Sequence, residues 1–269
     1  QGILEADEIA SEDSFVIEVG SNDGVMLEHM VNAGVRSLGI EPSLNVAKES
    51  NKYGVETISE FLGADLAREV AVSKGHANIV YAANVFCHIP EIDDLAKSCA
   101  ILLKDDGYLV FEDPYLGDVL QKVSYDQIYD EHVYLFNCTA VQDVFKKYGL
   151  ELFDCKHLNT HGGSMRYYFK KSASVSMTKN LSKQLEIEEK LEIKDIKTYE
   201  KFSQQCEFAK EGFKKSLESF KDKNSSIHLQ AFPKIPIKWK NEKLNEKWEK
   251  FKIIRKVVNA AIEVKRSKK

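Results

Sequence analysis

The sequence predicts an α/β fold in which a mostly parallel sheet of seven strands is flanked by helices and followed by a helical C-terminal extension. Short apolar runs alternate with stretches of helical periodicity up to Lys170, which is typical of a parallel sheet covered on both faces. From Lys179 to Lys223, apolar residues recur at three- and four-residue steps and predict one long helix. The 269 residues, 43% of them hydrophobic, suffice for one sizeable core and exclude disordered and fibrous classes.

Glycine, proline and N-cap residues mark the ends of the predicted elements. The first strand ends in Gly20, the second ends at Glu41 and Pro42, and Ser43 is expected to cap the next helix. The predicted strands span residues 15–19, 37–40, 55–58, 78–82, 108–111, 150–158 and 165–170. The predicted helices span residues 25–33, 44–52, 61–72, 92–103 and 139–148.

Composition favours a reduced, cytoplasmic protein. No run of roughly 18 to 20 apolar residues is present, and the first residues are acidic, unlike a signal peptide. The five cysteines contain no C-x-x-C pair, so we interpret them as reduced thiols, mostly in the core, rather than as disulfides or a zinc site.

Charge divides the chain near Asn224. Residues 225–269 carry 11 Lys and 2 Arg against 4 Glu, a net charge of +9, which leaves −13 for the rest of the chain. We therefore expect a cofactor-binding domain over residues 1–175, a helical extension over 176–224 and a basic amphipathic tail over 225–269.

The turn after the first strand predicts a cofactor site. Its glycines let the backbone approach a ligand closely, and the following helix offers free N–H groups. Glu41 ends the second strand 21 residues after Gly20, where an acid accepts hydrogen bonds from the hydroxyls of an adenosine ribose. The loop holds Asp23 and no basic residue, so a pyrophosphate is disfavoured, whereas the cationic groups of S-adenosylmethionine are compatible with it. The alternative is an ordinary turn without a ligand.

Several motifs resemble one family when taken in order. They are E-V-G-S-N-D-G at 18–24, G-I-E-P-S at 39–43, A-A-N-V-F-C-H-I at 82–89, E-D-P-Y-L at 112–116, Y-D-E-H at 129–132 and T-H-G-G-S-M-R at 160–166. The chain, over about residues 10–222, resembles the S-adenosylmethionine-dependent sugar C-methyltransferases, the family of the nucleotide-linked keto-sugar 3-C-methyltransferases. The resemblance implies a Rossmann-like class I methyltransferase fold and a small-molecule substrate, a nucleotide-linked sugar. The expected cofactor-binding residues are Glu18, Gly20, Ser21, Asn22, Asp23, Gly24, Glu41, Pro42 and Asn84.

A polar stretch after the fifth strand is the candidate active site. Making a carbon nucleophilic requires a base near a carbonyl-activated proton and a donor for the developing enolate. His132 suits the base because its ordinary pKa is about 6.5; Glu131 could orient the ring or share the proton, and Tyr129 could donate to the enolate oxygen. The resemblance implies the same roles, and the enolate carbon would then attack the methyl group. The alternative is a partly buried polar loop.

Other candidates are less specific. Tyr115, His161, Gly162 and Arg166 are expected to contact substrate, although Arg166 has an equal alternative as a surface residue. His88 either borders the cofactor with Asn84 or caps the helix near Pro90, and Cys87 is expected in the core. No His, Cys and Asp cluster at metal-ligand spacing is present, so no metal is expected.

The two ends of the chain depart from this family. Compared with the family, we expect the N-terminal zinc module and the C-terminal domain beyond the helical region to be missing. Residues 226–236 and 247–263 instead resemble part of a bacterial isoleucyl-tRNA synthetase. We interpret the tail as a fusion; tRNA binding by it is a minor alternative, so neither nucleic acid nor membrane is expected as a partner, and no oligomeric state is assigned. Two functional alternatives to C-methylation stay open: O- or N-methylation of another small molecule, and a non-catalytic remnant that binds S-adenosylmethionine.

Overall fold

The core of the molecule is one mixed sheet. In a computed structural model, which describes residues 14–171, 175–218, 242, 247–250 and 252, seven strands are arranged in the order β3-β2-β1-β4-β5-β7-β6. They are β1 (Phe15–Val19), β2 (Arg36–Ile40), β3 (Thr57–Ile58), β4 (Ala77–Ala83), β5 (Leu103–Pro114), β6 (Glu151–Leu158) and β7 (Ser164–Lys170). Strand β7 pairs antiparallel with β5 and β6, and the pairs among β1 to β5 are parallel. The predicted α/β fold with a mostly parallel seven-stranded sheet is confirmed.

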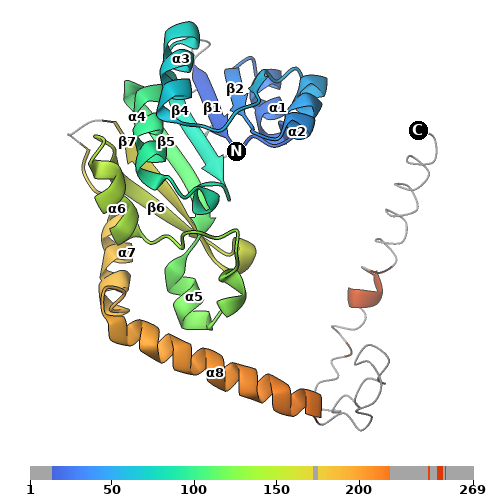
Figure 1. Cartoon of the computed structure of the whole chain (residues 1–269), viewed down its shortest axis with the longest axis vertical. Helices are drawn as coiled ribbons and strands as arrows, with labels where there is room; N and C mark the ends of the chain where they lie inside the picture. Colours follow the sequence, from blue (N-terminus) through green and yellow to red (C-terminus); the bar gives the residue numbers. More distant parts are fainter. Residues whose placement is uncertain (1–13, 172–174, 219–241, 243–246, 251, 253–269) are drawn as a thin grey trace. The chain divides into compact units, whose positions relative to one another are not determined.

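Helices flank this sheet, and the last of them leads away from it (Figure 1). They are α1 (Val25–Asn32), α2 (Leu44–Ser50), α3 (Ala64–Lys74), α4 (Ile92–Leu102), α5 (Leu116–Lys122), α6 (Cys138–Lys146), α7 (Lys179–Lys190) and α8 (Ile196–Glu218). Figure 1 shows α1 and α2 on one side of the parallel strands and α3 and α4 on the other. Adjacent residues of β1 alternate accordingly: Val16 packs in a cluster with Leu27 and Met30 of α1, whereas Ile17 packs in the larger cluster with residues of α3, α4 and α6.

Strand order creates a crevice at one edge of the sheet. The chain passes from β1 outward to β2 and β3, and then returns to place β4 on the other side of β1. Loops that leave the carboxyl ends of β1 and β4 therefore diverge, and ligands of doubly wound sheets bind at such a switch point.

The predicted long helix is wrong, because the chain breaks between α7 and α8. Glu192 adopts a left-handed conformation with φ of 52°, and Asp195 Oδ1 accepts a hydrogen bond from the Lys197 N–H at 2.9 Å to begin α8. These local caps end one helix and begin the next although the apolar periodicity continues across them. The predicted continuation to Lys223 and nearly all of the basic tail lie outside the described residues.

The helix predicted from Phe61 begins three residues later. Asp94 Oδ2 accepts from the N–H of Ala64 at 3.1 Å and so fixes the start of α3 from 30 residues away. Phe61 and Leu62 consequently stay in the loop before the helix. The short helix α5 was not predicted.

The chain divides into two compact units, Gln1–Ala209 and Lys210–Lys269. The first unit contains the whole sheet and α1 to α7. Within the described part of the chain, no helix combines the length and the apolar character that crossing a membrane requires. The described cysteines are all free thiols, and Cys87, Cys99, Cys138 and Cys155 are buried, as expected.

Candidate active site

The turn after β1 is shaped by glycine. Gly20 has φ of 68°, and a Cβ at this position would lie 2.4 Å from Cγ2 of Val85. Its N–H donates to the carbonyl of Ile40 at 2.8 Å, which ties the turn to the end of β2. Gly24, with φ of 84°, is the N-cap of α1. Because L-residues with a side chain rarely adopt such angles, glycine is required where the backbone turns into the helix.

The acid at the end of β2 organises the same loop. Glu41 is half-buried, and its Oε2 and Oε1 accept from the N–H groups of Asn22 at 3.2 Å and Ser43 at 2.8 Å. These bonds hold the carboxylate beside the turn, and Pro42 next to it is exposed. A carboxylate has about four lone-pair sites, so two remain for ligand hydroxyls.

A second acid lies beneath the turn. Glu18 is buried, and no hydrogen-bond partner is present for its Oε2 among the described residues. Burial, with a smaller contribution from Asp23, raises the pKa of Glu18 to about 8. A cation placed nearby would favour the ionised carboxylate. The neighbouring Ser21 hydroxyl is also buried without a hydrogen-bond partner in the described part of the chain.

These elements open into a cleft of about 520 Å³ at the switch point of the sheet. This volume lies within the usual range for small-molecule sites. The cleft is lined by Val19, Gly20, Asn22, Ile40, Glu41, Pro42, Glu60, Phe61, Leu62, Ala83, Asn84, Val85, His88 and Ile89. Five of the predicted cofactor residues, Gly20, Asn22, Glu41, Pro42 and Asn84, line it. Glu18, Ser21, Asp23 and Gly24 lie in the strand and turn behind it.

Sequence reasoning missed the apolar wall of this cleft. Phe61 is 83% exposed and lines the cleft with Leu62, because both residues precede α3 rather than forming its first turn. The signal in the sequence was an aromatic residue three positions after the end of a predicted strand.

His132 adjoins the cleft through His88. The centroids of the two rings lie 5.1 Å apart. Nδ1 of His88 lies 2.7 Å from the carbonyl oxygen of Glu131, and Nδ1 of His132 lies 2.8 Å from the carbonyl oxygen of Gln127. A carbonyl only accepts, so each Nδ1 carries a proton, and in the neutral ring the lone pair is on Nε2. His88 therefore does not cap the next helix, whose N-cap is Glu91.

Tyr129 completes this group. Its hydroxyl donates to Nε2 of His132 at 3.0 Å, and the ring is 47% exposed. The side chain of Glu131 is exposed, while its carbonyl holds His88. The structure thus places the phenol of Tyr129 in hydrogen-bond contact with the imidazole of His132.

The predicted substrate residues lie in different surroundings. His161 accepts from the Asn84 side-chain amide at 3.0 Å, which joins it to the cleft, and the carbonyl of Gly162 accepts from Lys122. Arg166 forms an ion pair with Glu112 at 2.8 Å. Its contact with substrate stays a prediction.

Tyr115 lies on a different network. It is 3% exposed and bonded to Gln184 and Glu188 of α7. We therefore assign Tyr115 to the attachment of α7 to the sheet domain.

Two buried acids escaped sequence reasoning. Asp113, at the end of β5, is fully buried beside the Cys87 thiol, and burial raises the pKa of Asp113 to about 7. Glu188 is 1% exposed and accepts from the N–H groups of Cys138 at 2.7 Å and Thr139 at 2.9 Å, which caps α6. The signal for Glu188 was its place on the apolar stripe of α7, where a charged residue requires a buried partner.

Three side chains that the sequence did not group as possible metal ligands lie close together. Cys87, His88 and His132 bring one ligand atom each within 4.8 Å of one another. The sequence did not reveal this cluster because its members are far apart along the chain. Glu131, the residue directly before His132, is 43 residues from His88.

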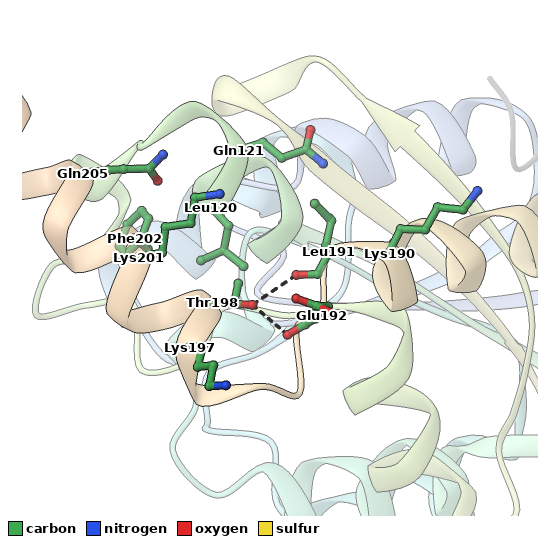
Figure 2. A pocket seen from close by; sticks show the side chains of 10 residues that line it. All are labelled: Leu120, Gln121, Lys190, Leu191, Glu192, Lys197, Thr198, Lys201, Phe202 and Gln205. Atoms are coloured by element: carbon green, nitrogen blue, oxygen red, sulfur yellow. Dashed lines mark hydrogen bonds between the residues drawn. The ribbon is translucent and has the colours of Figure 1, made fainter.

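A further cavity of about 440 Å³ lies between α5 and the turn that joins α7 to α8. Figure 2 shows its lysines, Lys190, Lys197 and Lys201, pointing in different directions, so their charges do not converge on a ligand. Thr198 donates to the carbonyls of Leu191 and Glu192, a role in holding the turn.

The site is typical of doubly wound α/β proteins that bind an adenosine-type cofactor. It combines a glycine turn after the first strand, an acid at the end of the second strand and a cleft at the switch point. Residues 2–154 match the family described as "Methyltransferase domain", and residues 159–231 match "C-methyltransferase C-terminal domain". The chain therefore belongs to this family of methyltransferase domains, and the expected class, the S-adenosylmethionine-dependent methyltransferases, is confirmed.

The chain is also similar to individual proteins. It is 37% identical over 150 residues to C-methyltransferase NovU of Streptomyces niveus. The matched region covers 56% of this chain and 36% of NovU. A SAM-dependent methyltransferase from Anabaena variabilis shares the fold with a TM-score of 0.50 at 15% identity, covering 63% of this chain and 82% of that one. The isoleucine–tRNA ligase of Mesorhizobium japonicum is 52% identical over 44 residues, which is 16% of this chain and 4% of the ligase. The chain thus spans about a third of the length of NovU, and its resemblance to a fragment of an isoleucyl-tRNA synthetase is confirmed.

Proposed function

We propose that this chain is the catalytic part of a C-methyltransferase that transfers a methyl group from S-adenosylmethionine to a nucleotide-linked keto-deoxysugar. His132 takes the proton from the carbon next to the ketone. The enolate carbon then forms a bond to the methyl carbon while the bond from that carbon to sulfur breaks, which leaves S-adenosylhomocysteine. Sequence similarity to NovU and to the C-methyltransferase C-terminal domain supports carbon as the methyl acceptor.

The observation that carries the proposal is the hydrogen bonding of the His132 ring. Its Nδ1 donates to the carbonyl of Gln127, so in the neutral ring the lone pair is on Nε2, which accepts a proton once the Tyr129 hydroxyl turns away from it. His88 lines the cofactor cleft and its ring lies 5.1 Å from that of His132, so base and cleft adjoin. A substrate carbon between them would be near both the base and the methyl donor.

The neighbouring groups fit supporting roles. The Tyr129 hydroxyl, which lies 3.0 Å from Nε2, is a donor for the developing enolate oxygen once substrate separates the two. Glu131 holds His88 through its carbonyl, and its exposed side chain is free to orient substrate.

The chain's own residues also suit the cofactor. Glu41 would accept the ribose hydroxyls, Phe61 and Leu62 offer an apolar wall for the adenine, and Glu18 favours a cation near the turn. Bound S-adenosylmethionine would supply the electrophilic methyl group. Asn84 and His161, joined by a hydrogen bond, lie at the rim of the cleft where substrate would enter.

Cofactor binding is tested by calorimetric titration of S-adenosylmethionine into the purified full chain. Saturable binding is expected, weakened by about 1 to 3 kcal/mol in Glu41→Ala because buried hydrogen bonds to a charged group are lost. The matched control is Glu49→Ala, which removes an exposed carboxylate paired with Lys52 on α2. Absence of binding by the folded wild-type chain would favour the remnant hypothesis.

The base is tested by deuterium exchange. We expect the chain, with S-adenosylhomocysteine bound, to exchange the proton next to the ketone of a nucleotide-linked keto-deoxysugar in D₂O. His132→Ala should slow this exchange by about 100-fold or more, the usual contribution of a general base, with unchanged cofactor affinity. A chain that methylates without exchange would be an O- or N-methyltransferase.

A further inference from the structure

The proposed base belongs to a second constellation of donor atoms. Cys87 and His88 lie in the 3-10 turn Phe86–His88 after β4, and His132 comes from the loop before α6. One ligand atom from each lies within 4.8 Å of the others. From this geometry we infer that Cys87, His88 and His132 bind a zinc-class divalent transition-metal ion with three protein ligands and an open fourth position.

The hydrogen bonds of both imidazoles support this inference independently of the distances. Each ring donates its Nδ1 proton to a backbone carbonyl, His88 to that of Glu131 and His132 to that of Gln127. Metal-ligating histidines typically use the second ring nitrogen in this way, which fixes the tautomer and orients the lone pair of the first. Both rings therefore present the coordinating form before any ion arrives.

The backbone around the three residues is also held together. The N–H of Tyr134 donates to the carbonyl of Cys87 at 3.1 Å, and the N–H of His132 donates to the carbonyl of Tyr129 at 2.9 Å. With metal–ligand bonds of about 2.0 to 2.3 Å, the three atoms need to contract only modestly around an ion.

The donor set selects the class of ion. One thiolate and two neutral imidazoles suit Zn²⁺ or Co²⁺ in tetrahedral geometry, whereas Mg²⁺ and Ca²⁺ require oxygen ligands. Binding forms one metal–sulfur and two metal–nitrogen bonds, and the Cys87 thiol releases its proton to solvent. No oxidation or reduction occurs.

Occupancy would have a functional consequence, which rests on the proposed function. The ion takes the Nε2 lone pair of His132, the same lone pair that removes the substrate proton, and it displaces the Tyr129 hydroxyl now 3.0 Å away. Metal binding and proton abstraction therefore exclude each other, so the ion acts as an inhibitor of the exchange reaction.

The test uses Co²⁺ as a spectroscopic probe on the full chain after treatment with a chelator. We expect a thiolate-to-cobalt charge-transfer band and tetrahedral ligand-field bands that saturate at one ion. Cys87→Ser should abolish the charge-transfer band, whereas Cys99→Ser, at another fully buried cysteine, should retain it. His88→Ala should weaken binding by at least about tenfold, and His29→Ala, at an exposed histidine of α1, should leave it unchanged.

Two outcomes would overturn the inference: no charge-transfer band in the wild-type chain, or a band that persists in Cys87→Ser with unchanged affinity in His88→Ala. Should Cys87→Ser fail to fold, His88→Ala at its half-buried position decides the question alone. The same samples are titrated with S-adenosylmethionine. A chain that binds the cofactor without binding Co²⁺ refutes the metal site and leaves the proposed function standing.

Discussion

The two halves of the sheet use their carboxylates differently. On the β1 to β4 side, Glu18 Oε2 is buried without a hydrogen-bond partner among the described residues, and Glu41 accepts only from backbone N–H groups. On the β5 to β7 side, Glu112 pairs with Arg166, Asp118 with His157, and Glu188 caps a helix. Glu18 and Glu41 thus keep acceptor capacity for a ligand, whereas Glu112, Asp118 and Glu188 hold the chain together. Asp113 is the exception in the second half, because its buried oxygens have no hydrogen-bond partner among the described residues. Substitution of Glu41 should therefore act on ligand binding, and substitution of Glu188 on stability.

The largest effect on stability is expected at Glu188. Glu188→Ala removes the acceptor of the buried N–H groups of Cys138 and Thr139 and of the Thr139 hydroxyl. Unsatisfied buried donors cost about 1 to 3 kcal/mol each, so the free energy of unfolding should fall by about 3 kcal/mol. Urea denaturation followed by circular dichroism measures this change.

Glu186→Ala is the matched control, because Glu186 is exposed on the same helix. It should change the free energy of unfolding by less than about 0.5 kcal/mol. Equal effects of the two substitutions would mean that α7 contributes through its helix propensity rather than through the cap.

The same contrast explains what the sequence could predict. The cleft was predictable because its parts follow strand ends: Gly20 after β1, Glu41 after β2 and Asn84 after β4 are brought to one edge by the parallel topology itself. The buried hydrogen-bond pairs were not predictable. Glu188 lies 50 residues from Cys138, and Glu112 lies 54 residues from Arg166, so no local pattern specifies which acid meets which donor. Local caps at Glu192 and Asp195, likewise, broke a helix whose apolar periodicity was continuous.

In the ligand-binding half, the expected effect on stability depends on pH. The pKa of Glu18 is raised to about 8 in the folded chain by burial, from an ordinary value of 4.5. Between these values the folded state binds more protons than the unfolded state, so stability falls as pH rises. Between pH 5.5 and pH 7 this loss is on the order of 2 kcal/mol, and Glu18→Gln should remove it.

Urea denaturation at these two pH values measures the slope. Glu49→Gln, an exposed control on α2, should retain the wild-type slope. Asp113 contributes a slope of the same sign, because burial raises the pKa of this carboxyl to about 7, so Glu18→Gln reduces the pH dependence without abolishing it. An unchanged slope in Glu18→Gln would show that the carboxyl is solvated in the folded chain.

The smallest expected difference separates two glycines with similar backbone angles. Gly20 has φ of 68° and Gly34 has φ of 75°, but an added Cβ meets Val85 at 2.4 Å at the first position and nothing within 4 Å at the second. Gly34→Ala should therefore cost about 1 kcal/mol from the backbone angle alone, and Gly20→Ala about 1 kcal/mol more, because Val85 must move. Since Val85 lines the cleft, Gly20→Ala should also weaken S-adenosylmethionine binding in the calorimeter, whereas Gly34→Ala should not. Equal cofactor affinities in the two variants would mean that the turn adjusts without disturbing the cleft, and that its glycine serves the fold rather than the ligand.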